Sequence, residues 1–238
     1  MNYFPLLLAA GSILGLALVA WRAPRQTLSR WLWACLLVLV LSLLGARAGF
    51  ILTHAAAYTR PMLEIFMIWE GGLSWVGAMA GGLAGIGLAA LFLQMPLDMT
   101  ADLLLWLLPP LAILTWLGCW FSGCAYGMAV LDDTEAWWGI NTLDETGQTL
   151  LRAPLQPLAA LILLAFFFRM ELEDASRLPP GRMAGILLSG FAVLQFLFTV
   201  VREDPVQILY GLRVDAWACL ALLGVGLMVL GWSFRPNR

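Results

Sequence analysis

Charged residues are scarce in this sequence, and lysine is absent from it. Only 12% of the 238 residues are charged, and the 13 basic residues, all of them arginine, stand against 15 acidic ones for a net charge of -2. The arginines do not cluster. This composition excludes the electropositive footprint of a nucleic-acid-binding protein, so no nucleic acid is expected among the partners.

Metal-binding and disulfide patterns are also lacking. The four cysteines, Cys35, Cys119, Cys124 and Cys219, lie in apolar surroundings without C-x-x-C or cysteine–histidine spacing. This spacing predicts neither a zinc site nor a disulfide framework. The single histidine, His54, cannot form a histidine cluster, which excludes most multi-histidine metal chemistry. We therefore expect no metal and no cofactor.

Apolar side chains, by contrast, are abundant. Hydrophobic residues make up 62% of the chain, and the mean hydropathy is +0.87. One soluble core of this length could not bury so much apolar surface. The composition predicts an integral membrane protein, with lipids and other membrane proteins as its partners.

Apolar runs of about 20 residues, the length that crosses a hydrocarbon core, recur along the chain. They predict a polytopic, all-α membrane protein of about seven transmembrane helices. The candidate spans are 4–21, 31–52, 74–93, 103–121, 155–168, 183–201 and 217–232, of which the fifth is the shortest. No linker, charge block or internal repeat marks a boundary, so residues 1–238 are expected to form one domain.

The distribution of arginine predicts the orientation of these spans. Cytoplasmic segments of membrane proteins carry an excess of basic residues, and this rule favours the N-terminus outside and the C-terminus inside. The acidic connection 125–153 then lies outside. In this arrangement the cytoplasmic arginines are Arg22, Arg25, Arg30, Arg169, Arg177, Arg182, Arg235 and Arg238, and the outer ones are Arg47, Arg60, Arg152, Arg202 and Arg213.

Two segments differ from plain lipid-facing helix. Gly77, Gly81 and Gly85 recur at a spacing of four, a stripe of small residues that predicts close approach of another helix. The segment 61–72 is apolar but too short to span, and it is expected to lie along the interface. It is either an amphipathic surface helix or part of a lipid-accessible site.

Two arginines, Arg47 and Arg202, are placed near membrane depth. An arginine there is costly unless it pairs with carboxylates, carbonyls or lipid phosphate. Both positions are near predicted helix ends, so snorkelling to the headgroups is the alternative to a lipid-binding role.

Several motifs carry a family resemblance. Residues 69–77 read W-E-G-G-L-S-W-V-G, and residues 118–127 read G-C-W-F-S-G-C-A-Y-G. The first resembles the W-E/Q-G-G-M/L-S-F-H-G motif, and the second the signature G-R-I-G-C-F-x-N-G-C-C-Y-G, of bacterial phosphatidylglycerol prolipoprotein diacylglyceryl transferases. Shorter matches keep the same order: residues 45–47 to G-A/G-R, Pro154 and Gln156 to H-P-x-Q-L-Y-E, and Arg202 and Glu203 with Gln207 to R-E-P-D-x-Q.

The resemblance implies a multi-pass protein of the bacterial plasma (inner) membrane that acts in lipoprotein biosynthesis. Members of the family move a diacylglyceryl group from phosphatidylglycerol to the thiol of a lipobox cysteine. The implied partners are phosphatidylglycerol or another anionic phospholipid and lipobox-containing prolipoproteins. By the same resemblance the substrate- or lipid-binding positions are Arg47, Glu70, Tyr126, Gln156, Arg202 and Glu203, and the motif glycines are Gly71, Gly72, Gly77, Gly118, Gly123 and Gly127.

The resemblance fails where the family carries charge, so no catalytic residue is assigned. The motif histidine falls on Val76 and the signature arginine on Trp116. The family segment R-F-x-x-E aligns with residues 195–199, which places Gln195 and Thr199 at its arginine and glutamate. Ser122 replaces the signature asparagine, and residues 153–159 lack the histidine, tyrosine and glutamate of H-P-x-Q-L-Y-E.

Two functions therefore stay open. The first is diacylglyceryl transfer, which the motif frame with Arg47, Arg202, Glu203 and Tyr126 favours. The second is a catalytically degenerate relative, a pseudoenzyme, that binds anionic lipid or lipoprotein precursor without transfer. The substitutions favour this reading, because losing one electrostatic donor lowers a rate by about two to three decades. A small-solute transporter would predict paired repeats and charged, broken helices, which the sequence lacks.

Overall fold

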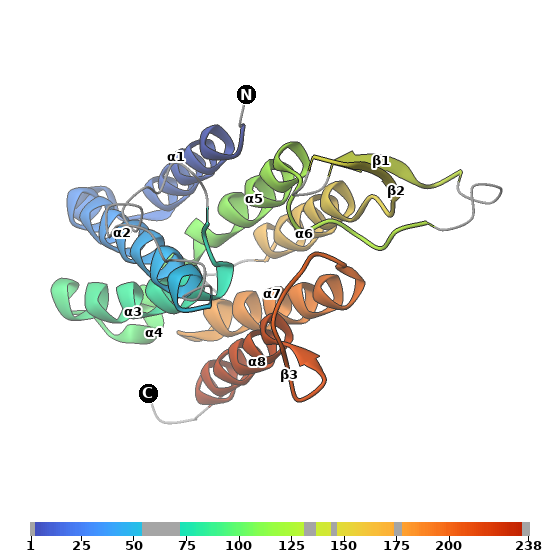
Figure 1. Ribbon diagram of the computed structural model, residues 1–238. Coiled ribbons are helices and arrows are strands. Elements are labelled where there is room, and N and C mark those ends of the chain that lie inside the picture. The colour runs from blue at the N-terminus through green and yellow to red at the C-terminus, as the bar shows by residue number, and fades with distance from the viewer. Residues whose placement is uncertain (1–2, 54–71, 131–136, 144–146, 174–177, 235–238) are drawn as a thin grey trace. The chain divides into compact units, whose positions relative to one another are not determined.

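The computed structural model describes residues 3–53, 72–130, 137–143, 147–173 and 178–234, and helices dominate it (Figure 1). The α-helices are α1 (Phe4–Arg22), α2 (Leu28–Thr53), α3 (Trp75–Leu93), α4 (Leu97–Leu104), α5 (Leu108–Ser122), α6 (Leu155–Glu171), α7 (Arg182–Val201) and α8 (Val214–Trp232). Short 3-10 helices, η1 (Arg25–Thr27) and η5 (Leu105–Leu107), precede α2 and α5. Six segments of the described chain, 4–22, 25–53, 75–93, 97–122, 182–201 and 214–232, are long and apolar enough to cross a membrane. The expected polytopic, all-α membrane protein is confirmed.

The predicted spans match the observed helices closely, with two qualifications. α6 has 17 residues, the lower limit for crossing a bilayer, so the count of seven stays a prediction. The span predicted at 103–121 belongs to a longer segment that is divided into α4, η5 and α5. The division has a local cause, because Pro109 and Pro110 occupy the first turn of α5 and have no N–H to donate to a preceding turn.

The contacts of the chain define two compact units. One unit, called unit A, comprises Met1–Gly15 and Leu105–Arg238, and the other, unit B, comprises Leu16–Leu104. One domain over residues 1–238 stays a prediction.

In unit B, α2 and α3 pack closely through glycine. The partner residues descend along α2 as the glycines ascend along α3, so the two helices are antiparallel. A Cβ atom would overlap the backbone of α2 at all three positions of the predicted stripe: the Gly45 carbonyl at Gly77, the Leu41 carbonyl at Gly81 and the Val38 Cα at Gly85. The predicted close approach of another helix is confirmed, and it is possible only because these positions have no side chain.

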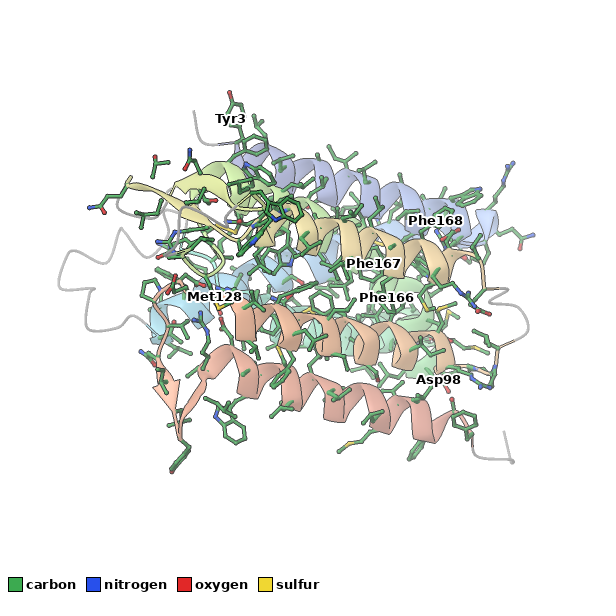
Figure 2. The ribbon with its side chains drawn as sticks, turned by 90° about the vertical axis from the view of Figure 1, so that its right-hand side faces the viewer. Tyr3, Asp98, Met128, Phe166, Phe167 and Phe168 are labelled. Atoms are coloured by element: carbon green, nitrogen blue, oxygen red, sulfur yellow. A yellow bond between two sulfur atoms is a disulfide. The ribbon has the colours of Figure 1, made fainter. Side chains whose placement is uncertain are left out.

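In unit A, small residues bring three helices together. A Cβ at Gly226 of α8 would meet the backbone of Ser189 in α7 at 2.7 Å. The ring of Phe166 in α6 lies against Gly190 of α7, and Figure 2 shows Phe166 between these two helices. Close packing of α6, α7 and α8 therefore sets the frame on which the polar groups at their ends are held.

Several chain segments of unit A end on the same side. The rings of Tyr3 and Phe121 are 5.6 Å apart, so α1 starts where α5 ends. A backbone bridge between Gly127 and Arg202 brings the end of α7 to the same place. Figure 2 shows Tyr3 and Met128 at this end and Phe168 toward the opposite one. The N-terminus and the connection after α5 thus share one side, as the predicted topology requires, and the outward orientation of that side stays a prediction.

Two short antiparallel hairpins occur at this end, and neither was expected. Strand β1 (Ile140–Leu143) pairs with β2 (Thr149–Arg152), with Ile140 opposite Arg152. Strand β3 (Ile208–Leu209) pairs with β4 (Leu212–Arg213), with Ile208 opposite Arg213. A search for long apolar runs does not detect strands of so few residues.

Candidate functional site

A polar cluster forms in unit A where the chain after α5, strands β2 and β4, the end of α7 and the start of α8 meet. The chain after α5 makes backbone bridges from Gly127 to Arg202 and from Ala129 to Arg152, so it lies between the end of α7 and strand β2. The N–H of Glu203 donates to the carbonyl of Tyr126 at 3.1 Å. The polar cluster comprises Tyr126, Arg152, Arg202, Glu203, Asp204, Arg213 and Asp215.

Arg152 is at the centre of the junction. It is 6% exposed, and its guanidinium carbon lies 4.0 Å from the ring centroid of Tyr126. Its Nη1 donates to Glu203 Oε2 at 3.1 Å. A cation between an aromatic face and a carboxylate is held by both charge and ring quadrupole. Sequence analysis missed Arg152 as a site residue, although its place two residues before the matched Pro154 was a usable signal.

Glu203 presents one carboxylate oxygen to two donors. Its Oε2 accepts from the N–H of Ala129 at 2.8 Å and from Arg152. The side chain is 51% exposed, so it is also open to solvent or a ligand. The predicted site residues Tyr126 and Glu203 are thus brought together, through an arginine that was not predicted.

Arg202 is committed to internal ion pairs. Its Nε donates to Asp204 Oδ1 at 2.8 Å, and its Nη1 lies 3.3 Å from Asp215 Oδ2. Burial alone would lower the pKa of Arg202, but the hydrogen bonds and charge of Asp204 and the charge of Asp215 raise that pKa overall. The carboxylate partners of Arg202 are therefore Asp204 and Asp215. Its contact with a lipid phosphate stays a prediction.

Arg213 holds the backbone on both sides of Glu203. Its Nη1 donates to the carbonyl of Arg202 at 3.1 Å and to that of Asp204 at 3.0 Å. Its Nη2 donates to Asp204 Oδ1 at 3.1 Å. Because the carbonyls before and after Glu203 are both held, the backbone from which its side chain extends is fixed. The polar cluster contains as many carboxylates as arginines, so an incoming phosphate must compete with internal partners.

The expectation of no disulfide was wrong, because Cys119 and Cys124 form one. Their spacing has no metal-site or C-x-x-C pattern, yet Gly123 ends α5 with a φ of 72° and turns the chain back. This turn brings the two Cα atoms to 4.6 Å. Glycine adopts such a left-handed conformation readily, which explains the matched Gly123.

Gln156 fastens the start of α6 to this turn. Its Nε2 donates to the carbonyl of Cys124 at 3.1 Å, and its side chain is fully buried. Its Oε1 has no hydrogen-bond partner among the described residues. Two motif glycines serve close packing nearby, since a Cβ would lie 2.8 Å from the Phe4 ring at Gly118 and 2.7 Å from the Ala153 carbonyl at Gly127.

The other matched residues belong to unit B. Arg47 is 8% exposed, and its Nη1 donates to the carbonyl of Gly72 at 3.2 Å. Ser74 caps α3 by accepting from the N–H of Gly77 at 3.3 Å, and its own N–H donates to the carbonyl of Ala46. The G-A-R motif (residues 45–47) and the G-G-x-S motif (residues 71–74) are therefore joined by hydrogen bonds. Glu70, Gly71 and the rest of segment 61–71 lie outside the described residues, as does His54.

Three of the positions where the family carries charge are buried in unit A and hold uncharged side chains: Trp116, Gln195 and Thr199. Trp116 is 5% exposed, and its ring meets that of Phe198 edge to face at 5.4 Å and 80°. Gln195 and Thr199 are buried on α7, where the Thr199 hydroxyl donates to the Gln195 carbonyl at 2.8 Å. We call Trp116, Phe198, Gln195 and Thr199 the apolar cluster. None of these side chains carries a charge.

The long apolar helices with a polar cluster at one end define a multi-pass membrane protein. The sequence model of the family described as Prolipoprotein diacylglyceryl transferase matches residues 1–232. The chain belongs to this family, whose members are proteins of the bacterial inner membrane, and that location holds for this chain as well.

Curated relatives agree with this assignment. All three named here are called phosphatidylglycerol--prolipoprotein diacylglyceryl transferase. The protein of Zymomonas mobilis is 28% identical over 221 residues, covering 87% of this chain and 72% of the relative. That of Hydrogenovibrio crunogenus is 24% identical over 203 residues, covering 82% and 75%, respectively. That of Burkholderia mallei is 26% identical over 221 residues, covering 81% and 74%.

Proposed function

We propose that this protein acts in bacterial lipoprotein modification and transfers a diacylglyceryl group from phosphatidylglycerol to the cysteine thiol of a lipobox peptide. Membership of the family over residues 1–232 supports the proposal. The observation that carries it is the half-exposed carboxylate of Glu203 at 3.1 Å from the guanidinium of Arg152. A base and a cation side by side are what thiol alkylation with a phosphate leaving group needs.

In the proposed reaction Glu203 accepts the proton of the lipobox thiol. The resulting thiolate attacks the diacylglyceryl carbon that is esterified to the phosphate, so a carbon–sulfur bond forms as the carbon–oxygen bond breaks. Glycerol phosphate leaves with the bonding electron pair, and Arg152 stabilises its negative charge. The ring of Tyr126, whose centroid lies 4.0 Å from the guanidinium carbon of Arg152, supports the guanidinium in its place beside Glu203. Arg202 and Arg213 act as positioning residues through the backbone next to Glu203.

A second candidate function, binding of phosphatidylglycerol or lipoprotein precursor without transfer, is favoured by the apolar cluster. The family's signature arginine is replaced by Trp116, which is buried against Phe198. Neither the histidine position nor the three family positions at Trp116, Gln195 and Thr199 carries charge. Since each lost electrostatic donor costs about two to three decades of rate, any transfer should be at least about 100-fold slower than in a relative with these groups.

A transfer assay separates the two functions. The purified protein in nanodiscs containing phosphatidylglycerol is incubated with a lipobox peptide, and the thioether product is measured by mass spectrometry. The proposal predicts a slow mass increase of one diacylglyceryl group that Glu203→Gln abolishes. The matched control is Glu173→Gln, which removes the carboxylate of an exposed ion pair with Arg169 and should leave the product unchanged.

The possible results are distinct. Retention of phosphatidylglycerol and peptide without product would support binding alone. Product formed equally well by Glu203→Gln would exclude Glu203 as the base, and absence of both binding and product would contradict both functions.

A further inference from the structure

The β3–β4 hairpin exposes large apolar side chains on a segment that has no charge. Residues 205–212 read P-V-Q-I-L-Y-G-L. Ile208 is 72% exposed, Leu209 51% and Tyr210 89%. A contiguous exposed apolar patch of this kind marks a surface that is covered by a partner or by lipid.

The hairpin is held in one conformation. Tyr210 and Gly211 form its turn with φ values of 49° and 80°, and two positive values are what a tight hairpin turn of the primed type requires. The indole N–H of Trp217 donates to the carbonyl of Leu209 at 2.9 Å. The N–H of Val214 donates to the carbonyl of Gln207 at 3.0 Å. The apolar side chains are therefore presented by a fixed element.

The charged residues that flank the hairpin are turned inward. Asp204 pairs with Arg202 and Arg213, and Asp215 pairs with Arg202. The side chains of Asp204 and Asp215 are 9% and 12% exposed. A charge at membrane depth is costly, but these charges are already paired and buried, so they do not oppose contact of the hairpin with lipid.

The exposed apolar surface continues from the hairpin onto α8. Strand β4 leads directly into this helix (Figure 1). Trp217 is 41% exposed, Leu220 40% and Val225 40%. Because α8 is one of the segments that can span the membrane, exposed apolar side chains along it face the acyl chains.

We infer that the β3–β4 hairpin lies in the boundary between headgroups and acyl chains of the adjoining leaflet, with Tyr210 as its interfacial anchor. Tyrosine and tryptophan are enriched at this depth, where an apolar ring and a polar tip are both satisfied. Through Arg213 and Asp204 the hairpin fixes the backbone at Glu203, so membrane contact holds the polar cluster at headgroup depth. This inference does not depend on transfer.

The second hairpin provides the contrast. β1–β2 presents Asn141 and the exposed Thr149, and the acidic residues Asp144 and Glu145 lie between its strands in the sequence. Leu150 on this hairpin is 43% exposed, so the contrast between the hairpins rests on the polar positions and the carboxylates of β1–β2. Two hairpins at the same end of unit A should therefore differ in environment.

Site-specific quenching tests the inference. A cysteine is introduced at Tyr210, labelled with an environment-sensitive nitrobenzoxadiazole fluorophore and placed in nanodiscs. Thr149→Cys, on the polar hairpin, is the aqueous control, and Val225→Cys, near the middle of α8, is the acyl-chain control. Cys35 and Cys219 are buried and Cys119 and Cys124 are bonded to each other, so unmodified protein gives the labelling background.

The expected result is quenching of the Tyr210 label by lipids brominated near the headgroup, more than by lipids brominated deep in the chain. Aqueous iodide should quench it about threefold less than the Thr149 label. Iodide quenching equal to that at Thr149, without quenching by brominated lipid, would overturn the inference and leave the hairpin open to a protein partner. Ile208→Cys makes the same prediction, so the test does not depend on the folding of one variant.

Discussion

The polar cluster and the apolar cluster both belong to unit A, but only the polar cluster keeps the charges of the family pattern. At the end of α7, Arg202 and Glu203 match the family. Arg202 is engaged in ion pairs, whereas Glu203 pairs with Arg152 and stays half exposed. About one turn earlier, Phe198 packs against Trp116 in a contact without charge, and the neighbouring Thr199 is buried. The charges that persist are those that also hold segments together. The charges that are gone have been replaced by side chains that pack.

This difference separates the frame of the site from its chemistry. In the polar cluster Arg202 and Arg213 serve the fold, because they connect the end of α7 to strand β4 and the start of α8. The protein can therefore lose a role of these arginines in substrate binding and still keep their contacts within the fold. In the apolar cluster a tryptophan fills the volume that a cation would need, so a simple return to arginine would have to bury an unpaired charge.

The largest effect is expected from Arg202→Met. Removing the guanidinium leaves Asp215 buried without its arginine partner and Asp204 with Arg213 alone, which should lower the free energy of unfolding by about 3 to 5 kcal/mol. Denaturant unfolding in detergent micelles measures this loss. Arg169→Met is the matched control, because its ion pair with Glu173 is exposed and should contribute less than about 0.5 kcal/mol.

Trp116→Ala should lower the free energy of unfolding by about 3 kcal/mol, because it empties a buried site against Phe198. Trp137→Ala, at a side chain that is 93% exposed, should change it by less than about 0.5 kcal/mol. Thermal melting of the two variants compares their losses of stability. An equal, small change would mean that Trp116 does not pack in the interior, and the distinction between the two clusters would fail.

Gly81→Leu measures how much the free energy of unfolding depends on an uncharged packing contact in unit B. The new side chain would overlap the carbonyl of Leu41, so a loss of about 2 kcal/mol is expected from forced separation of α2 and α3. Gly87→Leu on the same helix is the control, since a Cβ at Gly87 meets nothing within 4 Å. Equal melting temperatures of the two variants would show that the stripe faces lipid.

The smallest effect is expected from Glu203→Gln. Its side chain is half exposed, so loss of the charge pair with Arg152 should cost at most about 1 kcal/mol. A double-mutant cycle with Arg152→Gln, read by thermal melting, isolates the pair. A coupling energy as large as the loss expected for Arg202→Met would mean that Glu203 is a structural residue like Arg202 and Asp204. Its proposed role as a base would then lose support.

Much of the helical architecture could be predicted from sequence because lipid imposes a simple rule. Runs such as 183–201 must be long and apolar, and the observed α7 differs from that prediction by one residue at its start. The glycine stripe of α3 was equally readable, since small residues at spacing four have one main use in a helix. Motif order in the chain identified the family.

The disulfide and the two hairpins could not be predicted in the same way. Cys119 and Cys124 meet because Gly123 adopts a left-handed conformation, and a list of cysteine spacings does not contain that turn. Strands β3 and β4 contain two residues each, too few for periodicity to register.

The sequence by itself determined the class of the protein, the approximate positions of its apolar helices and its family, because length, hydrophobicity and motif order are properties of the chain. Only the tertiary structure decided which charges meet. Arg152 reaches Glu203 across 51 positions of sequence, and Arg202 pairs with Asp204 and Asp215 instead. Ion pairing acts over a few ångströms, and distances of that size between segments are set by how the helix ends and hairpins pack.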